Sequence, residues 1–412
     1  MRVAVAHLEA RRYYALPRVF FEENILCSFH TGVYIRSPSV RYVLGWAEKT
    51  GIKSVAGLKG RFHPGLKGAP IEDYKLLGFA HKLRRKRVRS GEERLFNLRV
   101  FRNFGRNIVR KGMGNPNVVY SLPGEALEIF ESVGEKGTKI LDQNLVHFRY
   151  LERILNEECE NWPRWGGGSF FKGGEDLLTE REEKEAGVAD AIFCPSQFVA
   201  RSMAAEGVSQ DKIRVVPYPT DLDAFFPIQR KRSRGPLKVL FLGKIGLRKG
   251  AHYLLEAANR LGKTAVQVKA VGEIGVPVEE LSLYKGVAEF PGRVPRNRVQ
   301  DEMAWADVLC LPSLGEGQSL ATNEALASGL PVVCTENTGS RVRDGVDGTI
   351  VPVRDVEALA LALERYATDD EFLAWQSEQA ISGRGRLGYS AYREVLMEEV
   401  QECFMRKQML IG

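Results

Sequence analysis

Two glutamates eight positions apart, Glu316 and Glu324, are the residues of this sequence best placed to do chemistry. They lie in the stretch "SLGEGQSLATNEALASGLPVVCT", Ser313 to Thr335. The pattern predicts a buried strand, a glycine-flanked turn that holds Glu316, and a helix with Glu324 in its first turns. The free N–H groups at such a helix start bind phosphate, and a carboxylate beside them accepts hydrogen bonds from ribose hydroxyls. Either acid alone is better explained as a turn residue or as an acid favoured by the helix dipole.

A basic loop is expected opposite the two glutamates. In "KVLFLGKIGLRKGAHYLLEAANRL", Lys244 ends a predicted strand, Gly246 loosens the loop, and Arg248 and Lys249 precede a helix that begins near Gly250. Cationic side chains beside exposed backbone N–H groups suit a diphosphate. The segment is not a Walker loop, because GxxxxGK[ST] is absent, and its glycines do not fall as GxGxxG. Taken alone, a solvated basic loop explains it equally well.

The elements that must position these residues follow an alternating α/β pattern. Short β-branched runs alternate with helical stretches, which predicts parallel sheets with crossover helices. We expect strands at "RVAVAHL", "NVVYS", "KILDQ", "AIFCPS", "IRVVPY", "KVLFLGK", "VQVKAVGE", "VLCLPS", "PVVCT" and "TIVP", and helices such as "AHYLLEAANRL" and "DVEALALALERYA". "ADAIFCPS" and "ADVLCLPS" echo one another, as two similar domains would produce.

The predicted fold is therefore α/β, with two Rossmann-like doubly wound domains facing each other across a cleft. We place the first domain at 1–218, a linker at 219–236, the second domain at 237–388, and a C-terminal helix at 389–412 that returns to the first domain. Ligands of such sheets bind outside the carboxyl ends of the strands, where both glutamates are expected.

Composition points to an ordinary globular protein. The 412 residues are 44% hydrophobic and 27% charged, a length that favours two domains. No apolar run approaches the ~20 residues that span a bilayer, and the N-terminus is too short in apolar residues for a signal peptide. The six cysteines form no CxxC, which favours buried thiols in a reducing compartment over disulfides or metal ligands. We expect a cytoplasmic protein, or one that is peripheral at the inner membrane face.

The two-glutamate segment resembles the signature of a known family. Glu316-GQSLATN-Glu324 followed by "ALASGLPVV" is similar to the E-x7-E motif of the retaining family-4 glycosyltransferases of the GT-B fold. "FLGKIGLRKG" resembles their phosphate loop, with Lys244 where many members have Arg and Lys249 at the usual Lys. "FPGRVPRNRV" resembles the loop that meets the nucleotide base. The resemblance covers about residues 182–367 and is weak over 1–139.

This resemblance implies a role for each matching residue. Glu324 would hold the donor ribose, Glu316 would contact the transferred sugar near its anomeric carbon, and Lys244 and Lys249 would neutralise the leaving diphosphate in place of a metal. The full set of expected donor-binding residues is Lys244, Arg248, Lys249, Gly292, Val294, Gly317, Gln318, Ser319, Leu320 and Glu324. No metal and no cofactor are expected.

Three features depart from the family pattern or imitate another one. Many members have Phe-Gly where this chain has Gln318-Ser319, and Asn323 takes a commonly apolar position. The glycine-rich loop usual after the first strand is replaced by "HLEARRYYALP". Asp221-Leu222-Asp223 is a D-x-D, the metal motif of a different fold, but after "VVPYP" a turn or capping role is favoured.

The first domain, which the resemblance makes the acceptor side, offers less certain candidates for catalysis and acceptor binding. His147, which follows a predicted strand end, is the best catalytic histidine, although packing at a helix start explains it equally well. Asp142 and Gln143 at the same strand edge are expected near the cleft, and His7 is a lesser candidate. "WPRWGGGSF", residues 162–170, is interpreted as a mobile loop whose aromatic residues either touch an acceptor or pack.

A basic stretch stands apart from these motifs. Residues 82–111 hold twelve Lys or Arg against two Glu, a net charge of +10. An apolar stripe at spacings of three and four, with arginines on another face, predicts an amphipathic helix. Its members are Leu95, Leu98, Phe101, Phe104 and Ile108, against Arg99, Arg102, Arg106 and Arg110. A core-packing helix with a solvated basic face, attachment to an anionic membrane surface and nucleic-acid binding are the three explanations. The last is disfavoured because no helix-turn-helix, RRM or zinc spacing appears.

The sequence thus predicts a retaining, metal-independent glycosyltransferase. It would move a hexose-type group from a nucleotide diphosphate sugar to a glycan, lipid-linked or small-molecule acceptor, in cell-surface polysaccharide or glycoconjugate biosynthesis. Two alternatives stay open, a nucleotide-sugar epimerase or hydrolase of the same fold and a non-catalytic binding protein that uses the basic stretch.

Overall fold

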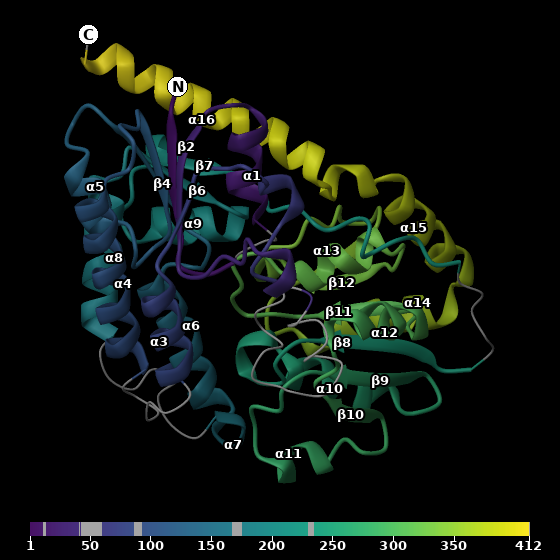
Figure 1. Cartoon of the computed structure of the whole chain (residues 1–412). Helices are drawn as coiled ribbons and strands as arrows, with labels where there is room; N and C mark the ends of the chain where they lie inside the picture. Colours follow the sequence, from purple (N-terminus) through teal and green to yellow (C-terminus); the bar gives the residue numbers. More distant parts are fainter. Residues whose placement is uncertain are drawn as a thin grey trace.

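The computed structural model describes residues 1–10, 14–40, 42, 60–85, 93–166, 175–229 and 235–411, without the side chains of 82–85, 93–94 and 175–176. Two all-parallel sheets, one from each half of the chain, lie side by side with helices on their faces (Figure 1). The predicted architecture of two doubly wound α/β layers is confirmed.

The first sheet has seven strands in the order β3-β2-β1-β4-β5-β6-β7. The strands are β1 (Val3–Ala6), β2 (Leu26–Thr31), β3 (Ile71–Asp73), β4 (Val118–Ser121), β5 (Thr138–Asp142), β6 (Ala191–Cys194) and β7 (Ile213–Val215). The helices are α1 (Ala15–Glu22), α3 (Lys75–Arg85), α4 (Glu93–Lys111), α5 (Leu127–Ser132), α6 (Phe148–Asn161), α7 (Pro163–Gly166), α8 (Glu175–Val188) and α9 (Gln197–Ala205). Each parallel step needs a crossover, and these helices supply the crossovers on both faces.

The second sheet has six strands in the order β10-β9-β8-β11-β12-β13. The strands are β8 (Leu237–Leu242), β9 (Val266–Val271), β10 (Ala288–Gly292), β11 (Val308–Leu311), β12 (Val332–Thr335) and β13 (Gly348–Val351). The helices are α10 (Ala251–Leu261), α11 (Val278–Ser282), α12 (Val299–Trp305), α13 (Leu320–Ala327), α14 (Val356–Thr368) and α15 (Asp370–Ser382). The central strand β11 is buried at every position, and β8 is buried at Leu237 and from Val239 to Phe241, which explains their apolar sequences.

All ten strands expected from the sequence are present, but β2, β3 and β10 were missed. β3 and β10 are edge strands, and edge positions tolerate the charges of "IED" and the proline of "AEFPG", which hide a strand signal. β2, "LCSFHT", is interior but has no β-branched residue before its last position, so its strand signal is weak.

The repeated A-D sequence has the same structural job in both domains. The Asp190 carboxylate accepts a hydrogen bond from the Lys139 N–H at 2.9 Å, at the start of the neighbouring strand β5. The Asp307 carboxylate accepts from the Lys238 N–H at 2.9 Å, at the start of β8. Each aspartate therefore ties the start of its own buried strand to the strand beside it.

The C-terminal helix α16 (Tyr389–Ile411) returns to the first domain, as predicted, and runs along its outer edge (Figure 1). Its buried residues Tyr392, Leu396, Val400 and Cys403 belong to the core cluster that contains strand β1. The chain therefore ends on the domain where it began, and the domain boundaries drawn above stay predictions.

Helices α6 and α7 connect the two domains a further time. Trp165 is 3% exposed and belongs to the core cluster of the second domain. Its ring lies 5.3 Å from that of His252, and the Trp162 ring lies 4.7 Å from the same histidine. Of the two alternatives for these aromatic residues, packing is confirmed, although residues 163–166 form the short helix α7 and no loop. Residues 167–170 lie outside the described part of the chain.

Glu158 forms the polar centre of this connection. It is fully buried on α6 and accepts hydrogen bonds from His252 Nε2 at 2.7 Å and Tyr253 OH at 2.6 Å, both on α10. Arg354 Nε donates to its other oxygen at 2.7 Å. Burial alone would raise the pKa of Glu158, but these donors hold it below its ordinary value. One carboxylate from the first half of the chain therefore collects three donors from the second.

Candidate active site

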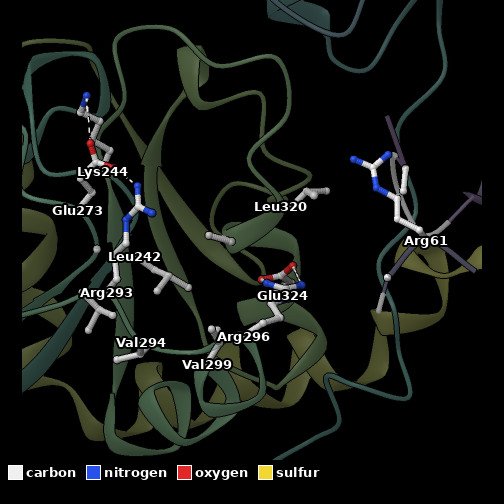
Figure 2. Close-up of a pocket in the computed structure, with 16 residues that line it drawn as sticks. Arg61, Leu242, Lys244, Glu273, Arg293, Val294, Arg296, Val299, Leu320 and Glu324 are labelled. Atoms are coloured by element: carbon white, nitrogen blue, oxygen red, sulfur yellow. Dashed lines mark hydrogen bonds and ion pairs between the residues drawn. The ribbon is translucent and has the colours of Figure 1, made fainter. Parts of the chain in front are cut away.

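A cavity of about 750 Å³ lies where the two domains face each other (Figure 2). The second domain contributes the carboxyl ends of β8 and β9, the loop after β10 and the start of α13. The first domain contributes Ala10, Gly60 and Arg61. In Figure 2 Arg61 stands across the cavity from Leu320 and Glu324. A pocket of this size at the carboxyl edge of a doubly wound sheet is a typical ligand site.

Glu324 lines this cavity from the first turns of α13 and is paired with Arg296. Arg296 Nη1 donates to Glu324 Oε2 at 2.8 Å, and Nη2 forms a second bond to Oε1. Burial raises the pKa of Glu324, and the Arg296 bonds partly offset that rise. The Arg296 side chain is 50% exposed, whereas that of Glu324 is 4% exposed. Arg296 is the more exposed member of the pair, and its Cζ lies 4.8 Å from the centre of the Phe225 ring.

Glu316 pairs with two of the three cations of the basic loop. Arg248 Nη1 and Lys249 Nζ each lie 3.2 Å from Glu316 Oε1. The Lys249 side chain also packs on Gly243, where an added Cβ would lie 2.6 Å from Lys249 Cδ. Gly243 itself lines the cavity. The loop after β8 and the turn after β11 therefore meet at one cluster beside the cavity, as the sequence predicted for Arg248, Lys249 and Glu316.

Lys244 lies at the far side of the cavity from Glu324 in Figure 2 and belongs to a separate cluster. Its Nζ is 3.6 Å from Glu273 Oε1, and Arg293 pairs with the other Glu273 oxygen. Lys244 is 60% exposed and Arg293 74% exposed. Long, exposed cations of this kind reach a phosphate without a fixed geometry.

The turn between Glu316 and α13 contacts the first domain. An added Cβ on Gly317 would lie 2.1 Å from Asn144 O, and the Gly317 carbonyl accepts from Ser196 Oγ at 2.6 Å. The Gln318 amide bonds the Tyr218 backbone in both directions, accepting at 2.7 Å and donating at 3.2 Å. Gly317 and Gln318 are therefore interdomain contacts in this structure.

Some of the remaining expected donor-binding residues line the cavity, and the others bond to the backbone around it. Leu320 and Val294 line the cavity, whereas Gly292 O accepts from the Gly272 N–H at 2.9 Å at its edge. The Ser319 N–H donates to Thr338 O at 3.2 Å, so this N–H is already bonded. Asn323 is fully buried, and its amide atoms have no partner among the described residues.

His147 does not line the cavity. It is 1% exposed at the start of α6, its Nε2 lies 3.7 Å from Glu182 Oε2, and burial lowers its pKa. Glu182 also accepts from Gln143 Nε2 at 2.6 Å and from the Phe148 N–H at 2.9 Å. The carboxylate thus holds the loop that carries the histidine, and this burial gives the catalytic role of His147 no support.

Asp142, Gln143 and His7 are likewise occupied inside the first domain. Asp142 Oδ1 accepts from Tyr218 OH at 2.6 Å, Gln143 is fully buried, and His7 Nδ1 lies 2.7 Å from Glu9 O. Their part in acceptor chemistry stays a prediction.

The buried Glu182 gives a test by pH. Burial raises its pKa from 4.5 to about 7, so between these values the folded protein binds more protons than the unfolded chain. The free energy of unfolding therefore falls as the pH rises from about 4.5 to about 7 and levels above that.

We expect Glu182→Gln to flatten this part of the profile of unfolding free energy against pH, measured by urea unfolding. Glu180→Gln on the same helix, where the side chain is 57% exposed, is the control and leaves the profile unchanged. An unaltered profile in Glu182→Gln would contradict the assignment.

The D-x-D sequence forms a turn. Asp221 Oδ1 accepts hydrogen bonds from the Asp223 and Ala224 N–H groups, each at 3.1 Å. The favoured capping role of Asp221 is therefore confirmed. Among the described residues no group of three or more His, Cys, Asp or Glu is arranged to hold a metal ion.

The described part of the basic stretch is the end of α3, residues 82–85, and the amphipathic helix α4. Phe104 and Ile108 are fully buried in the first domain, and Arg99, Arg102, Arg106 and Arg110 are exposed. This arrangement agrees with a core-packing helix that has a solvated basic face. Residues 86–92 lie outside the described chain, and attachment to an anionic membrane stays a prediction. No helix in the described ranges has the length and apolarity to cross a bilayer.

Several cavity residues escaped the sequence analysis. Arg293 and Arg296 lie within "FPGRVPRNRV", of which only Gly292 and Val294 were among the expected donor-binding residues, and Glu273 ends "VQVKAVGE". Arg61 had no motif around it. A charged residue directly after a predicted strand end was the available signal for Glu273, whereas Arg61 is brought to the cavity only by the facing of the two domains.

Part of the chain is similar in sequence to known glycosyltransferases. Residues 236–369 match the family model of glycosyl transferases group 1. The D-inositol 3-phosphate glycosyltransferase of Geodermatophilus obscurus is 32% identical over 219 residues, which are 47% of this chain and 49% of the relative. The lipopolysaccharide core biosynthesis glycosyltransferase LpsE of Rhizobium meliloti is 28% identical over 207 residues, 47% of this chain and 60% of the relative. The chain spans about half the length of the curated relatives it matches.

Solved structures match nearly the whole chain in shape. Anabaena Alr3699/HepE in complex with UDP and glucose has a TM-score of 0.59 at 13% identity, over 98% of this chain and 100% of that chain. Sucrose-phosphate synthase of Thermosynechococcus elongatus has a TM-score of 0.62 at 15% identity, with the same coverage. Residues 236–369 thus match the glycosyl transferases group 1, and the chain as a whole has the GT-B fold of these structures.

Proposed function

We propose that this protein is a retaining, metal-independent glycosyltransferase that uses a nucleotide diphosphate sugar. The observation that carries the proposal is the meeting of Arg248, Lys249 and Glu316 at one cluster beside the interdomain cavity. Cations from one strand end and an acid from another are what a leaving diphosphate and a transferred sugar require together. The family match over the same residues supports it.

In this proposal the cavity holds the nucleoside part of the donor. Glu324 accepts hydrogen bonds from the ribose hydroxyls once Arg296 moves aside, and the loop at Gly292 and Val294 meets the base. Lys244 and Lys249 bind the diphosphate oxygens. Glu316 lies beside the anomeric carbon of the sugar.

The reaction balances without a dedicated base. The bond from the anomeric carbon to the phosphate oxygen breaks, and its electron pair leaves with the diphosphate. The acceptor hydroxyl oxygen forms the new bond on the same face of the sugar, and its proton passes to the departing phosphate oxygen. Arg248 and Lys249 stabilise the negative charge that develops there, which is the part of the reaction that a preorganised site accelerates most.

The acceptor is proposed to be a saccharide of a cell-surface glycoconjugate. One relative acts in lipopolysaccharide core biosynthesis by its name, and another is named for D-inositol 3-phosphate. The first name supports a cell-surface glycoconjugate, and the second keeps a small-molecule acceptor open as the alternative.

The test is nucleotide binding followed by product analysis. Thermal unfolding is measured with UDP, GDP and ADP, each with and without EDTA. A nucleotide at 100 times its Kd adds ~2.7 kcal/mol to stability, and we expect one of the three to raise the midpoint equally in EDTA. The matching nucleotide sugar then gives a product whose anomeric configuration, read by NMR, equals that of the donor. A midpoint that rises only with a divalent cation, or an inverted product, would overturn the corresponding part of the proposal.

A further inference from the structure

One cation of the donor cavity belongs to the first domain. Arg61 lines the cavity of about 750 Å³ together with Lys244 and Glu324 of the second domain. In Figure 2 its guanidinium points across the cavity toward Leu320, at the start of α13. None of the roles assigned above uses this side chain.

The Arg61 guanidinium has no partner in the described part of the chain. It forms no hydrogen bond and no ion pair with any described residue, although the Arg61 backbone oxygen accepts from the Ile35 N–H at 2.8 Å. The residue is only partly exposed. A guanidinium has five N–H donors in a planar fork, and a charge that loses part of its water without gaining a partner costs free energy. An anionic ligand in the cavity would supply that partner.

The acids that line the cavity are paired with other cations. Among the described lining residues the carboxylates are Glu273 and Glu324. Arg293 pairs with Glu273, and Arg296 makes two bonds to Glu324. Both of these arginines follow β10 in the second domain. The carboxylates of the opposite wall are therefore occupied, and the charge of Arg61 stays available to a ligand.

The loop that carries Arg61 is fixed to the first domain. The ring of the next residue, Phe62, lies 6.0 Å from that of Tyr34 and packs against the core cluster that contains β1. Tyr34 OH donates to His63 O at 3.1 Å. The backbone of Arg61 is thus held by its neighbours, so replacing its side chain removes a charge without removing the contacts that hold the loop.

The anionic part of a nucleotide sugar is its diphosphate. A nucleoside and a hexose are neutral and offer no oxyanion to Arg61. Arginine binds phosphate through two parallel N–H···O bonds, which adds a defined geometry to the charge. Leu320 and Ala321, in the first turn of α13, line the same cavity, and the free N–H groups of a helix start bind phosphate as well. The diphosphate is therefore the part of the donor that the arginine and the helix start can both bind.

We propose that Arg61 binds the diphosphate of the nucleotide sugar from the first-domain side. The inference rests on the proposed glycosyltransferase function, and it adds a first-domain residue to a donor site that is otherwise built by the second domain. The phosphates would then be contacted by both domains, through Lys244 and Lys249 from one and Arg61 from the other.

The test compares each nucleoside diphosphate with its nucleoside on the full chain. The Kd values of UDP, GDP and ADP are measured by calorimetric titration, and those of uridine, guanosine and adenosine by saturation-transfer difference NMR. For the nucleotide that binds, we expect Arg61→Ala to raise Kd roughly 10- to 100-fold, the effect of losing one hydrogen bond between charged groups. The Kd of the nucleoside is expected to stay unchanged. Arg61→Lys keeps the charge but not the planar fork, and we expect it to raise the diphosphate Kd by a smaller factor.

Arg106→Ala is the matched control. Arg106 belongs to the same domain, is exposed on α4, and is not among the described residues that line the donor cavity. Its removal is expected to change none of the Kd values, so a change specific to Arg61 is not the effect of one net charge. The unfolding midpoint without ligand is recorded for each variant, and Arg61→Lys carries the test if Arg61→Ala does not fold.

The outcomes separate this inference from the proposed function. A diphosphate Kd that rises in Arg61→Ala but not in Arg106→Ala, with the nucleoside Kd unchanged, supports the inference. A diphosphate Kd that Arg61→Ala leaves unaltered overturns it while the donor site stands, and a nucleoside Kd that rises by the same factor overturns the assignment to the phosphates. If the unaltered protein binds none of the three nucleoside diphosphates, the proposed function fails and this inference fails with it.

Discussion

Lys249→Ala is expected to lower the rate of sugar transfer by roughly 10²- to 10³-fold, the usual cost of one charge-assisted contact to a developing anion. Lys249 Nζ lies 3.2 Å from Glu316 Oε1, and its side chain is 13% exposed. Water is therefore a poor substitute for the ammonium group. The nucleotide midpoint shift is expected to disappear in the same variant, because the diphosphate loses its least exposed cation. Steady-state kinetics with the matching donor measures the first effect, and thermal unfolding measures the second.

Lys263→Ala is the control for this prediction. It removes the same charge from an exposed position just after α10 and is expected to change neither rate nor midpoint shift. If Lys249→Ala and Lys263→Ala had the same transfer rate and the same midpoint shift, the assignment of residues 244–249 as the phosphate loop would be wrong. A Lys249→Ala protein that keeps the nucleotide shift but loses turnover would instead restrict Lys249 to the transition state.

The second large effect is expected for stability. Glu158→Ala leaves His252, Tyr253 and Arg354 without their shared acceptor in a buried site, and breaking a buried charged network in this way costs about 3–5 kcal/mol. The free energy of unfolding is measured in urea by tryptophan fluorescence, since Trp162 lies 4.7 Å from the His252 ring, between centroids.

Glu157→Ala is its neighbour and its control. Glu157 pairs with the same arginine, Arg354, at 2.9 Å, but its side chain is 59% exposed. Exposed pairs of this kind contribute about 0–1 kcal/mol. Should the two substitutions destabilise the protein equally, burial of Glu158 would not be the source of its effect.

Local patterns in the sequence were enough to predict most of the fold. The strand β11 is a continuous apolar run, β8 is one apart from Lys238, and α10 has a clear helical period, so each element carries its own signal. The convergence of Lys249 and Glu316 also followed, because both come directly after central strands whose carboxyl ends share one edge.

Pairings that depend on the packing of distant segments were not predictable. Arg296 and Glu324 are 28 positions apart, after β10 and in α13, and no local pattern shows that the two side chains meet. Glu158 and Arg354 are 196 positions apart and belong to different domains. The glycines after Trp165 predicted a loop. The indole packs into the core of the second domain, and that contact depends on how the two domains come together.

Trp165 and Glu158 belong to the first half of the chain but pack against the second domain. This packing matters for any chimera that is built to exchange the second domain between related proteins. A chimera joined only at the linker would pair this second domain with a foreign α6–α7 segment. It would leave a hole where the indole sits and deprive His252, Tyr253 and Arg354 of their acceptor. An exchange of donor halves between related chains should therefore carry residues 148–166 along with the second domain. The unit to be exchanged therefore consists of two separate stretches of the sequence, residues 148–166 and the second domain.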